Sequence, residues 1–335
     1  MNLNFLKNKT LLITGGTGSF GKSLVSYLIN SRAPLKKIII FSRDELKQFD
    51  MSRTFNPEKY KCLRYFIGDV RDKDRLKLSF RDVDFVVHAA ALKQVPSAEY
   101  NPLEYIKTNI IGAQNIIEAS LENKVSNIIA LSTDKASSPI NLYGATKLCS
   151  DKLFISANNI RGKQLIKYSV VRYGNVMGSR GSVLHSFIEQ KKKGLLLVTD
   201  KNMTRFNISL EESVVKVLWA LQNNLGGEIF IPKIPSFYIM DLAKAISPAS
   251  KIKFIGMRPG EKLHEEMISY YDSCTTVQLK NGYAILTQEV LKKYLKKGLR
   301  LVNKNFVYRS DLNKDFLNVD QLRLIVKNTL SKLVV

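Results

Sequence analysis

The segment ALSTDKASSPINLYGATK (residues 130–147) carries side chains that can move a proton at a secondary alcohol. Tyr143 and Lys147 are four residues apart, so they share one face if the segment is helical. A phenol with a pKa of about 10 is a poor base near neutral pH, but a neighbouring ammonium stabilises the phenolate and makes proton abstraction feasible. Thr133, at the end of the preceding apolar run, can share the proton of a substrate hydroxyl. These residues predict hydride transfer from a secondary alcohol to a nicotinamide.

A glycine-rich turn lies upstream of this segment. In LLITGGTGSFGKSLVSYLI (residues 11–29), Gly15, Gly18 and Gly21 stand three apart between an apolar run and an amphipathic stretch. The first glycine permits a tight turn, the second lets the backbone approach a pyrophosphate, and the third allows close packing of helix on strand. The N-terminus of the following helix supplies amides and a positive dipole. We therefore expect a dinucleotide site here.

The second apolar run ends in FSRDE (residues 41–45), where NAD enzymes offer a carboxylate to the ribose 2′-hydroxyl. Ser42 and Arg43 come first in this chain, and a hydroxyl with a guanidinium suits a 2′-phosphate, which favours NADP over NAD. Asp44 can instead bond a ribose hydroxyl. Asp69, after the third run, is expected to meet the adenine amine, with a helix N-cap as the alternative.

The first half of the chain alternates β-branched runs with amphipathic stretches, which is typical of a parallel sheet with crossover helices. Right-handed crossovers then build a doubly wound, Rossmann-type α/β sheet whose ligands lie at the carboxyl ends of the strands. The glycine turn, FSRDE, Asp69 and Thr133 all fall at such ends. The expected strands are residues 10–14, 37–41, 63–67, 85–88, 127–132 and 166–172.

The alternation becomes irregular after about residue 175, which predicts a second, smaller and discontinuous domain. A helix is expected at residues 211–221, and GGEIFIP (residues 226–232) is typical of a late strand that returns to the main sheet. No chemical motif is evident after about residue 275. We assign residues 1–175 and 209–237 to a nucleotide-binding domain, and residues 176–208 and 238–335 to a substrate-binding domain.

The chain has 335 residues and a net charge of +23, with lysines scattered along its length. No nucleic-acid-binding signature accompanies this charge, so we expect a lysine-rich surface that attracts phosphate-bearing ligands and no nucleic-acid partner. Neither a signal peptide nor an apolar run of about 18 residues is found, which predicts a cytoplasmic protein without a membrane partner. Cys62, Cys149 and Cys274 are expected to be reduced and buried, and no metal-ligand spacing is present.

Longer motifs resemble a known family. TGGTGSFG, STDK, YGATK and RYGNV are similar to the extended short-chain dehydrogenase/reductases. A narrower resemblance, from about residue 8 to about residue 270, is to the inverting UDP-N-acetylglucosamine 4,6-dehydratases that open pseudaminic acid biosynthesis. It implies NADP, a UDP-sugar substrate and a homo-oligomer, either a dimer or a hexamer. It rests on GGTGSFGK, FSRDELKQ, FIGDVRD, HAAALK, AEYNPLEYIKTNI, LSTDKASSPINLYGATKLCSDKLF, VVRYGNVMGSRGSV, MTRF, GGEIFIPKIPS and RPGEKLHE.

The resemblance also implies a mechanism. Tyr143 removes the proton of the sugar 4-hydroxyl as hydride passes to NADP, and the 4-ketone acidifies carbon 5. Lys135 removes the carbon-5 proton, Asp134 protonates the departing 6-hydroxyl, hydride returns to carbon 6, and reprotonation from the opposite face inverts carbon 5. Because a lysine must be partly neutral to act as a base, the pKa of Lys135 is expected to be depressed. A surface ion pair of Asp134 and Lys135 is the alternative interpretation.

The contact residues complete these expectations. The chain departs from the family pattern at Gln94, Asn207 and the pair His185 and Ser186, positions that bear on substrate preference. Cofactor contacts are expected from Gly15, Thr17, Gly18, Ser19, Phe20, Gly21, Ser42, Arg43, Asp44, Lys47, Asp69, Val70, Ala89, Lys93, Asn109, Tyr143, Lys147 and Val176. The resemblance assigns the UDP-sugar to Lys93, Asn175, Thr204, Arg205, Arg258 and Glu261. The arginines are expected to grip the diphosphate, and an ion pair of Arg258 with Glu261 in the second domain is the alternative.

Three other functions use much of this machinery. A UDP-hexose 4-epimerase shares the tyrosine and lysine but needs neither an elimination acid nor a carbon-5 base, so Asp134 and Lys135 favour dehydration. A retaining 4,6-dehydratase differs in the configuration of carbon 5 in its product. An NADP-binding redox sensor or scaffold often lacks the Tyr-x-x-x-Lys pair, which Tyr143 and Lys147 retain here.

Overall fold

The computed structural model describes residues 1–179 and 181–333, the last two of these by their backbone only. Within them a nine-stranded sheet has the order β14-β15-β10-β6-β5-β4-β1-β2-β3. Neighbouring strands from β10 to β3 are parallel, whereas β15 runs antiparallel to β10 and β14 antiparallel to β15. The strands are β1 Thr10–Thr14, β2 Lys37–Ser42, β3 Leu63–Ile67, β4 Phe85–His88, β5 Asn127–Thr133, β6 Lys167–Tyr173, β10 Glu228–Pro232, β14 Thr276–Leu279 and β15 Gly282–Leu286.

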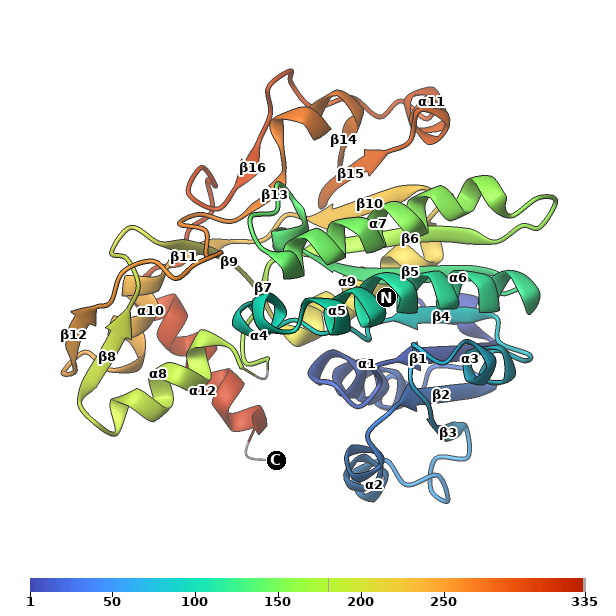
Figure 1. Cartoon of the computed structure of the whole chain (residues 1–335), viewed down its shortest axis with the longest axis horizontal. Coiled ribbons are helices and arrows are strands. Elements are labelled where there is room, and N and C mark those ends of the chain that lie inside the picture. The colour runs from blue at the N-terminus through green and yellow to red at the C-terminus, as the bar shows by residue number, and fades with distance from the viewer. Residues whose placement is uncertain (180, 334–335) are drawn as a thin grey trace.

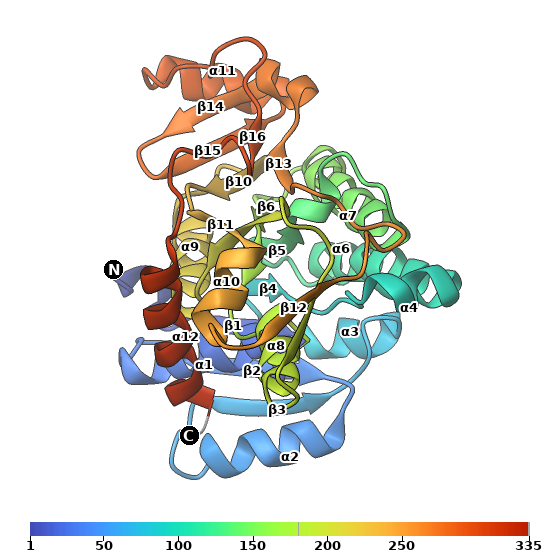
Figure 2. The same cartoon turned by 90° about the vertical axis from the view of Figure 1, so that its left-hand side faces the viewer.

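Helices cover both faces of this sheet. One face carries α1 beside α9, and the other carries α3, α6 and α7 side by side (Figure 2). The predicted doubly wound fold is therefore confirmed, and each of the six predicted strands is found within one residue of its expected ends. The helices of this part are α1 Ser19–Asn30, α2 Glu45–Thr54, α3 Lys73–Ser79, α4 Val95–Tyr100, α5 Pro102–Tyr105, the π-helical turn Ile106–Ile111, α6 Gly112–Glu122, α7 Leu142–Ile160 and α9 Leu210–Asn223.

The elements α8, α10, α12, β8 and β12 form a smaller unit, at the left of Figure 1, with an apolar core that includes Leu184, Phe187, Leu242 and Leu322. The elements α11, β13 and β16 lie at the top of Figure 1, and their buried residues join the core of the main sheet. Short sheets pair β9 with β7 and β11, β8 with β12, and β13 with β16. The strands are β7 Asn175–Val176, β8 Leu195–Val198, β9 Thr204–Ile208, β11 Ser236–Tyr238, β12 Lys251–Phe254, β13 Glu266–Ile268 and β16 Tyr308–Arg309. The helices are α8 Val183–Lys191, α10 Ile239–Ile246, α11 Gln288–Lys296 and α12 Val319–Leu333, and 3-10 turns cover Asn4–Leu6, Asp134–Ala136 and Tyr270–Thr275.

The chain beyond residue 209 crosses between the two parts. The predicted late strand is confirmed, because β10 lies between β6 and β15 in the main sheet. The prediction that residues 276–286 belong to the substrate-binding domain is wrong, because β14 and β15 extend the main sheet and β15 pairs with β10 over five residue pairs. The expected burial of the cysteines is also wrong at Cys149 and Cys274, which lie exposed on α7 and on the turn Tyr270–Thr275, while Cys62 is half-buried.

Local capping fixes where α7 begins, and therefore where its tyrosine lies. The Asn141 side chain accepts a hydrogen bond of 2.8 Å from the Gly144 backbone N–H, which satisfies one of the free donors at the helix start. A Cβ at Gly144 would collide with the Lys135 carbonyl oxygen, so only glycine lets α7 pack this closely on the turn after β5. The first turn of α7 thus lies directly against Asp134 and Lys135.

Candidate active site

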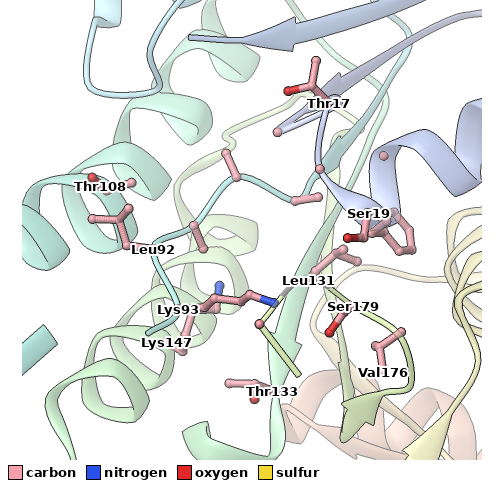
Figure 3. Close-up of a pocket in the computed structure, with 18 of the residues that line it drawn as sticks. Thr17, Ser19, Leu92, Lys93, Thr108, Leu131, Thr133, Lys147, Val176 and Ser179 are labelled. Carbon is pink, nitrogen blue, oxygen red and sulfur yellow. The ribbon is translucent and has the colours of Figure 1, made fainter. Parts of the chain in front are cut away.

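A cavity of about 630 Å³ opens at the carboxyl ends of β1 to β6, where the two parts of the chain meet. In Figure 3, Lys93 extends from the segment after β4 into this cavity, and Thr17, Lys147, Val176 and Ser179 surround it. The cavity is lined by most of the predicted site residues: Gly15, Thr17, Gly18, Ser19, Phe20, Gly21, Ser42, Arg43, Asp44, Lys47, Asp69, Val70, Ala89, Lys93, Thr133, Asp134, Lys135, Tyr143, Lys147, Asn175 and Val176. Its lining does not include Asn109, Thr204, Arg205, Arg258 or Glu261.

The glycine turn forms one wall of the cavity. Gly15 has a φ of +65°, and a Cβ there would lie 2.8 Å from the Ala90 backbone, so the turn and the segment after β4 touch through main-chain atoms. A Cβ at Gly21 would collide with the Gly16 carbonyl, which shows how closely α1 packs on the turn. Gly18 caps α1 without a side-chain hydrogen bond. This cradle leaves room for backbone approach by a pyrophosphate and fits a dinucleotide.

The end of β2 carries the residues expected to distinguish NADP from NAD. The Asp44 side chain caps α2 by accepting a hydrogen bond of 3.0 Å from the Lys47 N–H, and it pairs with the Lys47 ammonium. Ser42 lines the cavity, and its hydroxyl accepts a 3.0 Å hydrogen bond from Gln48. The guanidinium of Arg43 is 55% exposed. Asp44 is therefore already engaged, whereas Arg43 is accessible to an anion.

Asp69 does not cap a helix, because Asp72 caps α3 by accepting from the Arg75 N–H at 2.9 Å. Asp69 Oδ2 accepts instead from Arg71 Nε and Nη2 at 3.0 and 2.8 Å, and Arg43 Nη1 lies 3.8 Å away. Burial raises the pKa of Asp69, but Arg71 lowers it by more, so this carboxylate is ionised near neutral pH. It lines the cavity as a fixed acceptor.

Asn109 supports the cavity wall from behind. Its Oδ1 accepts from the Leu92 N–H at 2.9 Å, and its Nδ2 donates to the Leu92 carbonyl at 2.9 Å and to Thr146 Oγ1 at 3.0 Å. It therefore holds the segment after β4 against α7. His88, at the end of β4, is buried and bonds Thr14 Oγ1 through Nδ1 at 2.8 Å, and burial lowers its pKa to about 3.

Thr133, Tyr143 and Lys147 all line the cavity. Burial lowers the pKa of Lys147, opposed by Asp151. Burial raises the pKa of Tyr143 to about 12, opposed by Lys135 and Thr133. Burial thus opposes the expected stabilisation of the phenolate by a neighbouring ammonium, because it raises the pKa of Tyr143 by more than Lys135 and Thr133 lower it.

Asp134 and Lys135 are not a surface pair. Asp134 is 1% exposed, and its Oδ1 lies 3.1 Å from Lys135 Nζ and accepts a 2.9 Å hydrogen bond from Thr133. Burial raises the pKa of Asp134. Burial lowers the pKa of Lys135, but Asp134 and Glu265 raise it by more, so its pKa stands above its ordinary value. The expected depression of the Lys135 pKa is therefore wrong for this state, because two carboxylates surround the amine.

Glu265 was missed in the sequence, although it lies inside the motif RPGEKLHE. Its Oε1 is 2.9 Å from Lys135 Nζ and 3.7 Å from Arg205 Nε, and the carboxylate is buried. Burial raises the pKa of Glu265, but Lys135 and Arg205 lower it by more. One signal in the sequence could have identified Glu265. It is a carboxylate inside a family motif, at a position where it is not needed to cap a helix or form a turn.

The residues assigned to the UDP-sugar lie in two places. Lys93 and Asn175 line the cavity, and burial lowers the pKa of Lys93. Arg205 is buried outside the cavity lining, and its Nε lies 3.7 Å from Oε1 of Glu265, the carboxylate that contacts Lys135. Thr204 is fully buried and bonds His264 and Ser310, at 2.8 and 2.7 Å, so its hydroxyl supports the fold rather than facing the cavity.

Arg258 and Glu261 lie on the segment between β12 and β13. Glu261 Oε1 is 3.5 Å from Arg205 Nη2, and Glu261 Oε2 accepts from the Arg258 backbone N–H at 3.4 Å. No ion pair joins the side chains of Arg258 and Glu261 within the described part of the chain, and the Arg258 side chain is exposed. Of the positions that depart from the family pattern, Gln94 lines the cavity, Asn207 is buried on β9, and His185 bonds Ser182 at 3.1 Å.

The fold and this cavity define a Rossmann-type α/β protein with its site at the carboxyl ends of the parallel strands, where this fold class binds nucleotides. The chain belongs to the polysaccharide biosynthesis protein family, whose model matches residues 11–287. It is 54% identical to a UDP-N-acetylglucosamine 4,6-dehydratase (inverting) from Campylobacter jejuni subsp. jejuni serotype O:23/36, over 96% of this chain and 98% of that protein. It is 46% identical to a UDP-glucose 4-epimerase from Rickettsia massiliae, over 83% of each chain.

A solved structure extends this likeness. The X-ray structure of Pen from Bacillus thuringiensis matches with a TM-score of 0.88 and 36% identity, over 97% of this chain and 99% of that chain. The resemblance recognised in the sequence is therefore confirmed at the level of the family. In the part of the chain that the structure describes, no helix is long and apolar enough to cross a membrane.

Proposed function

We propose that this protein is an NADP-dependent UDP-N-acetylglucosamine 4,6-dehydratase that inverts carbon 5, giving UDP-2-acetamido-2,6-dideoxy-L-arabino-hex-4-ulose. The observation that carries the proposal is the buried pair Asp134 and Lys135, joined at 3.1 Å beside Thr133 and Tyr143 in one cavity. Oxidation at carbon 4 needs only the tyrosine and its neighbours. Loss of water also needs an acid and a base, and this pair supplies both chemical types.

The cofactor assignment rests on the glycine cradle and the end of β2. Gly15 and Gly18 would receive the pyrophosphate, and Ser42, Arg43 and Lys47 would hold the 2′-phosphate, because Asp44 is engaged in capping α2. When bound, oxidised NADP would supply positive charge, a hydride acceptor for the oxidation at carbon 4 and a hydride donor for the later reduction at carbon 6. Arg43 and Lys47 suit a phosphate better than a free hydroxyl, which favours NADP over NAD.

The residues of the chain then divide the proton transfers among them. Tyr143, assisted by Thr133, takes the proton of the sugar 4-hydroxyl. Lys135 takes the proton of carbon 5, which the neighbouring ketone has acidified, and Asp134 gives its proton to the departing 6-hydroxyl. The buried position of Asp134 raises its pKa and so favours the protonated form that an acid requires. Reprotonation of carbon 5 from the opposite face inverts that centre.

A UDP-hexose 4-epimerase is the second candidate, favoured by the 46% identical Rickettsia protein of that name. Epimerisation uses Tyr143 and leaves Asp134 and Lys135 without a proton to move. A retaining dehydratase is the remaining enzymatic alternative. The buried acid and amine favour dehydration over epimerisation, and the 54% identical Campylobacter relative carries the inverting name.

One assay separates these activities. The purified protein is incubated with UDP-N-acetylglucosamine without added reductant, and the product is examined by mass spectrometry and proton NMR. Loss of one water with inverted configuration at carbon 5 is the expected result. An unchanged mass with a new 4-epimer would contradict dehydration, and retained configuration would contradict inversion. A requirement for stoichiometric NADPH would contradict an internal return of hydride.

The wider setting follows from the same proposal. We place the reaction as the first step towards pseudaminic acid, in the cytoplasm, and we expect a dimer or a hexamer. Residues 1–175 and 209–237 would bind the cofactor, and residues 176–208 with 238–335, apart from the strands β14 and β15, would bind the UDP-sugar. The net charge of +23 would draw phosphate-bearing ligands towards the protein.

A further inference from the structure

Lys135 lies between two buried carboxylates that come from distant parts of the chain. Its Nζ is 3.1 Å from Asp134 Oδ1 and 2.9 Å from Glu265 Oε1. The backbone of Glu265 is held on both sides by Ser310, since Glu265 N–H donates to Ser310 Oγ at 2.9 Å and Ser310 N–H donates to the Glu265 carbonyl at 2.8 Å. These two hydrogen bonds fix the backbone of Glu265, so its carboxylate is held beside the Lys135 amine.

We propose that Glu265 is a positioning residue that holds the Lys135 amine against Asp134, so that a proton passes directly from Lys135 to Asp134 and creates the base and the acid of the elimination. This inference rests on the proposed dehydratase function. In the transfer, one N–H bond of the Lys135 ammonium breaks and one O–H bond forms on Asp134. The number of protons and the net charge of the pair stay constant, so the resting ion pair and the reactive pair are tautomers.

The proposal accounts for a conflict within the site. Elimination needs a neutral Lys135 and a protonated Asp134, whereas an isolated Lys135 in these surroundings keeps its proton, because its pKa is raised by Asp134 and Glu265 despite burial. A proton that moves across the 3.1 Å contact satisfies both needs at once. No exchange with solvent is required, which suits a site where Asp134 is almost completely buried.

The surroundings also decide which of the two carboxylates takes the proton. Burial raises the pKa of Asp134, and Glu265 adds to the rise. Burial also raises the pKa of Glu265, but Lys135, Arg205 and Lys262 lower it by more. Glu265 Oε1 also lies 3.7 Å from Arg205 Nε, so a second cation favours its ionised form, whereas Asp134 pairs with Lys135 at 3.1 Å. Asp134 is therefore the proton acceptor, and Glu265 remains the anion that fixes the amine.

Other titratable groups face this cluster as well. The Arg205 guanidinium opposes the rise in the Lys135 pKa. The charge of Lys135 in turn lowers the pKa of Lys93. Burial has the largest effect on the Tyr143 pKa and raises it. Asp134 adds to this rise, and Lys135 opposes it. Lys262 donates a hydrogen bond to the Ser137 carbonyl at 2.6 Å, and burial lowers its pKa. A change at Glu265 therefore acts first on the Lys135 amine, which Glu265 and Asp134 both contact.

The test is Glu265→Gln, with Glu266→Gln as the matched control. Glu266 is the next residue and undergoes the same loss of charge, but its carboxylate accepts from the Ser137 and Ser138 hydroxyls at 3.1 and 2.8 Å rather than from Lys135. For Glu265→Gln, kcat for dehydration is expected to fall about tenfold to hundredfold, with little change in KM. Glu266→Gln is expected to leave kcat near the native value.

The pH profile gives a readout that loss of packing would not move. Removal of the Glu265 charge lowers the pKa of both Asp134 and Lys135, so both limbs of the kcat profile should move to lower pH in Glu265→Gln and stay in place in Glu266→Gln. Native kcat and unmoved limbs in Glu265→Gln, or a shift equal to that of the control, would overturn the proposal.

Two further measurements keep the outcomes distinct. Glu265→Asp retains the charge but withdraws the carboxylate by one methylene, so a fall in kcat of about tenfold with unmoved limbs is expected even if the glutamine variant does not fold. Native kcat in Glu265→Asp would overturn the positioning role. Failure of the native protein to release water from any UDP-sugar overturns the dehydratase function and this inference together, whereas normal native dehydration with an unaffected Glu265 variant overturns the inference alone.

Discussion

The two ends of the cavity handle charge in opposite ways. At the cofactor end, Arg43 and Lys47 are 55% and 46% exposed, and their ion pairs face solvent. At the catalytic end, Asp134 and Glu265 are buried within a cluster of four charged groups that also includes Lys135 and Arg205. Exposed charges attract a ligand with little effect on one another, whereas buried charges shift each other's pKa strongly. The difference separates a surface that binds from a cluster that moves protons.

The largest effect is expected where the buried groups act on the sugar. Tyr143→Phe and Lys135→Ala should each lower kcat by about 100-fold or more, because each removes a positioned proton-transfer group. The measurement is the rate of water loss from UDP-N-acetylglucosamine, with exposed Tyr271→Phe and Lys152→Ala as matched controls. Continued exchange of the carbon-5 hydrogen with solvent in Lys135→Ala would refute its role as the base.

At the cofactor end, a change in the glycine turn should weaken NADP binding more than the loss of a charged side chain. Gly15→Ala introduces a Cβ at a φ of +65° and 2.8 Å from the Ala90 backbone, so NADP affinity should fall about tenfold to hundredfold. Isothermal titration measures this. Gly162→Ala is the matched control, because Gly162 has a φ of +60° with nothing within 4 Å of the added Cβ. Equal losses in the two variants would show that general strain, and not the cradle, is responsible.

A smaller effect is expected from the exposed guanidinium. Arg43→Ala should weaken NADP binding by about tenfold and leave NAD binding nearly unchanged, because only NADP carries the 2′-phosphate. Competition between the two cofactors provides the measurement, with Arg53→Ala on α2 as the control. A native preference for NAD over NADP at equal concentration would overturn the assignment itself.

The smallest effect concerns acid stability, through the buried histidine of β4. Burial lowers the folded-state pKa of His88 to about 3, below an unfolded value of about 6.5, so the unfolded state binds the extra proton first. This contribution to stability is complete above pH 6.5 or so and is lost as pH falls towards 3. Between about pH 6 and 5, the free energy of unfolding should drop by about 1 kcal/mol. Denaturant titration measures it, and an equally steep slope in His88→Asn would contradict the assignment.

Much of the fold could be predicted because its signals are local. The β-branched runs, the glycine turn and the spacing of Tyr143 and Lys147 each lie within one strand or helix, and the structure contains them at the expected positions. The pairing of β14 with β15 on the main sheet was not predicted, because an antiparallel addition at a sheet edge depends on which strand is left unpaired. Nor was the exposure of Cys149 and Cys274, which depends on which helix face is covered.

The sequence by itself determined the Rossmann-type sheet, the dinucleotide cradle and the residue types available for proton transfer, since periodicity, glycine spacing and helical spacing are properties of neighbouring residues. Only the tertiary structure decided the electrostatic state of those residues. Glu265 is 130 positions from Lys135 in the chain, yet the fold brings the two side chains to 2.9 Å and reverses the expected shift of the lysine pKa. A pKa depends on burial and on charges within a few ångströms, and these are set by the packing of segments distant in sequence.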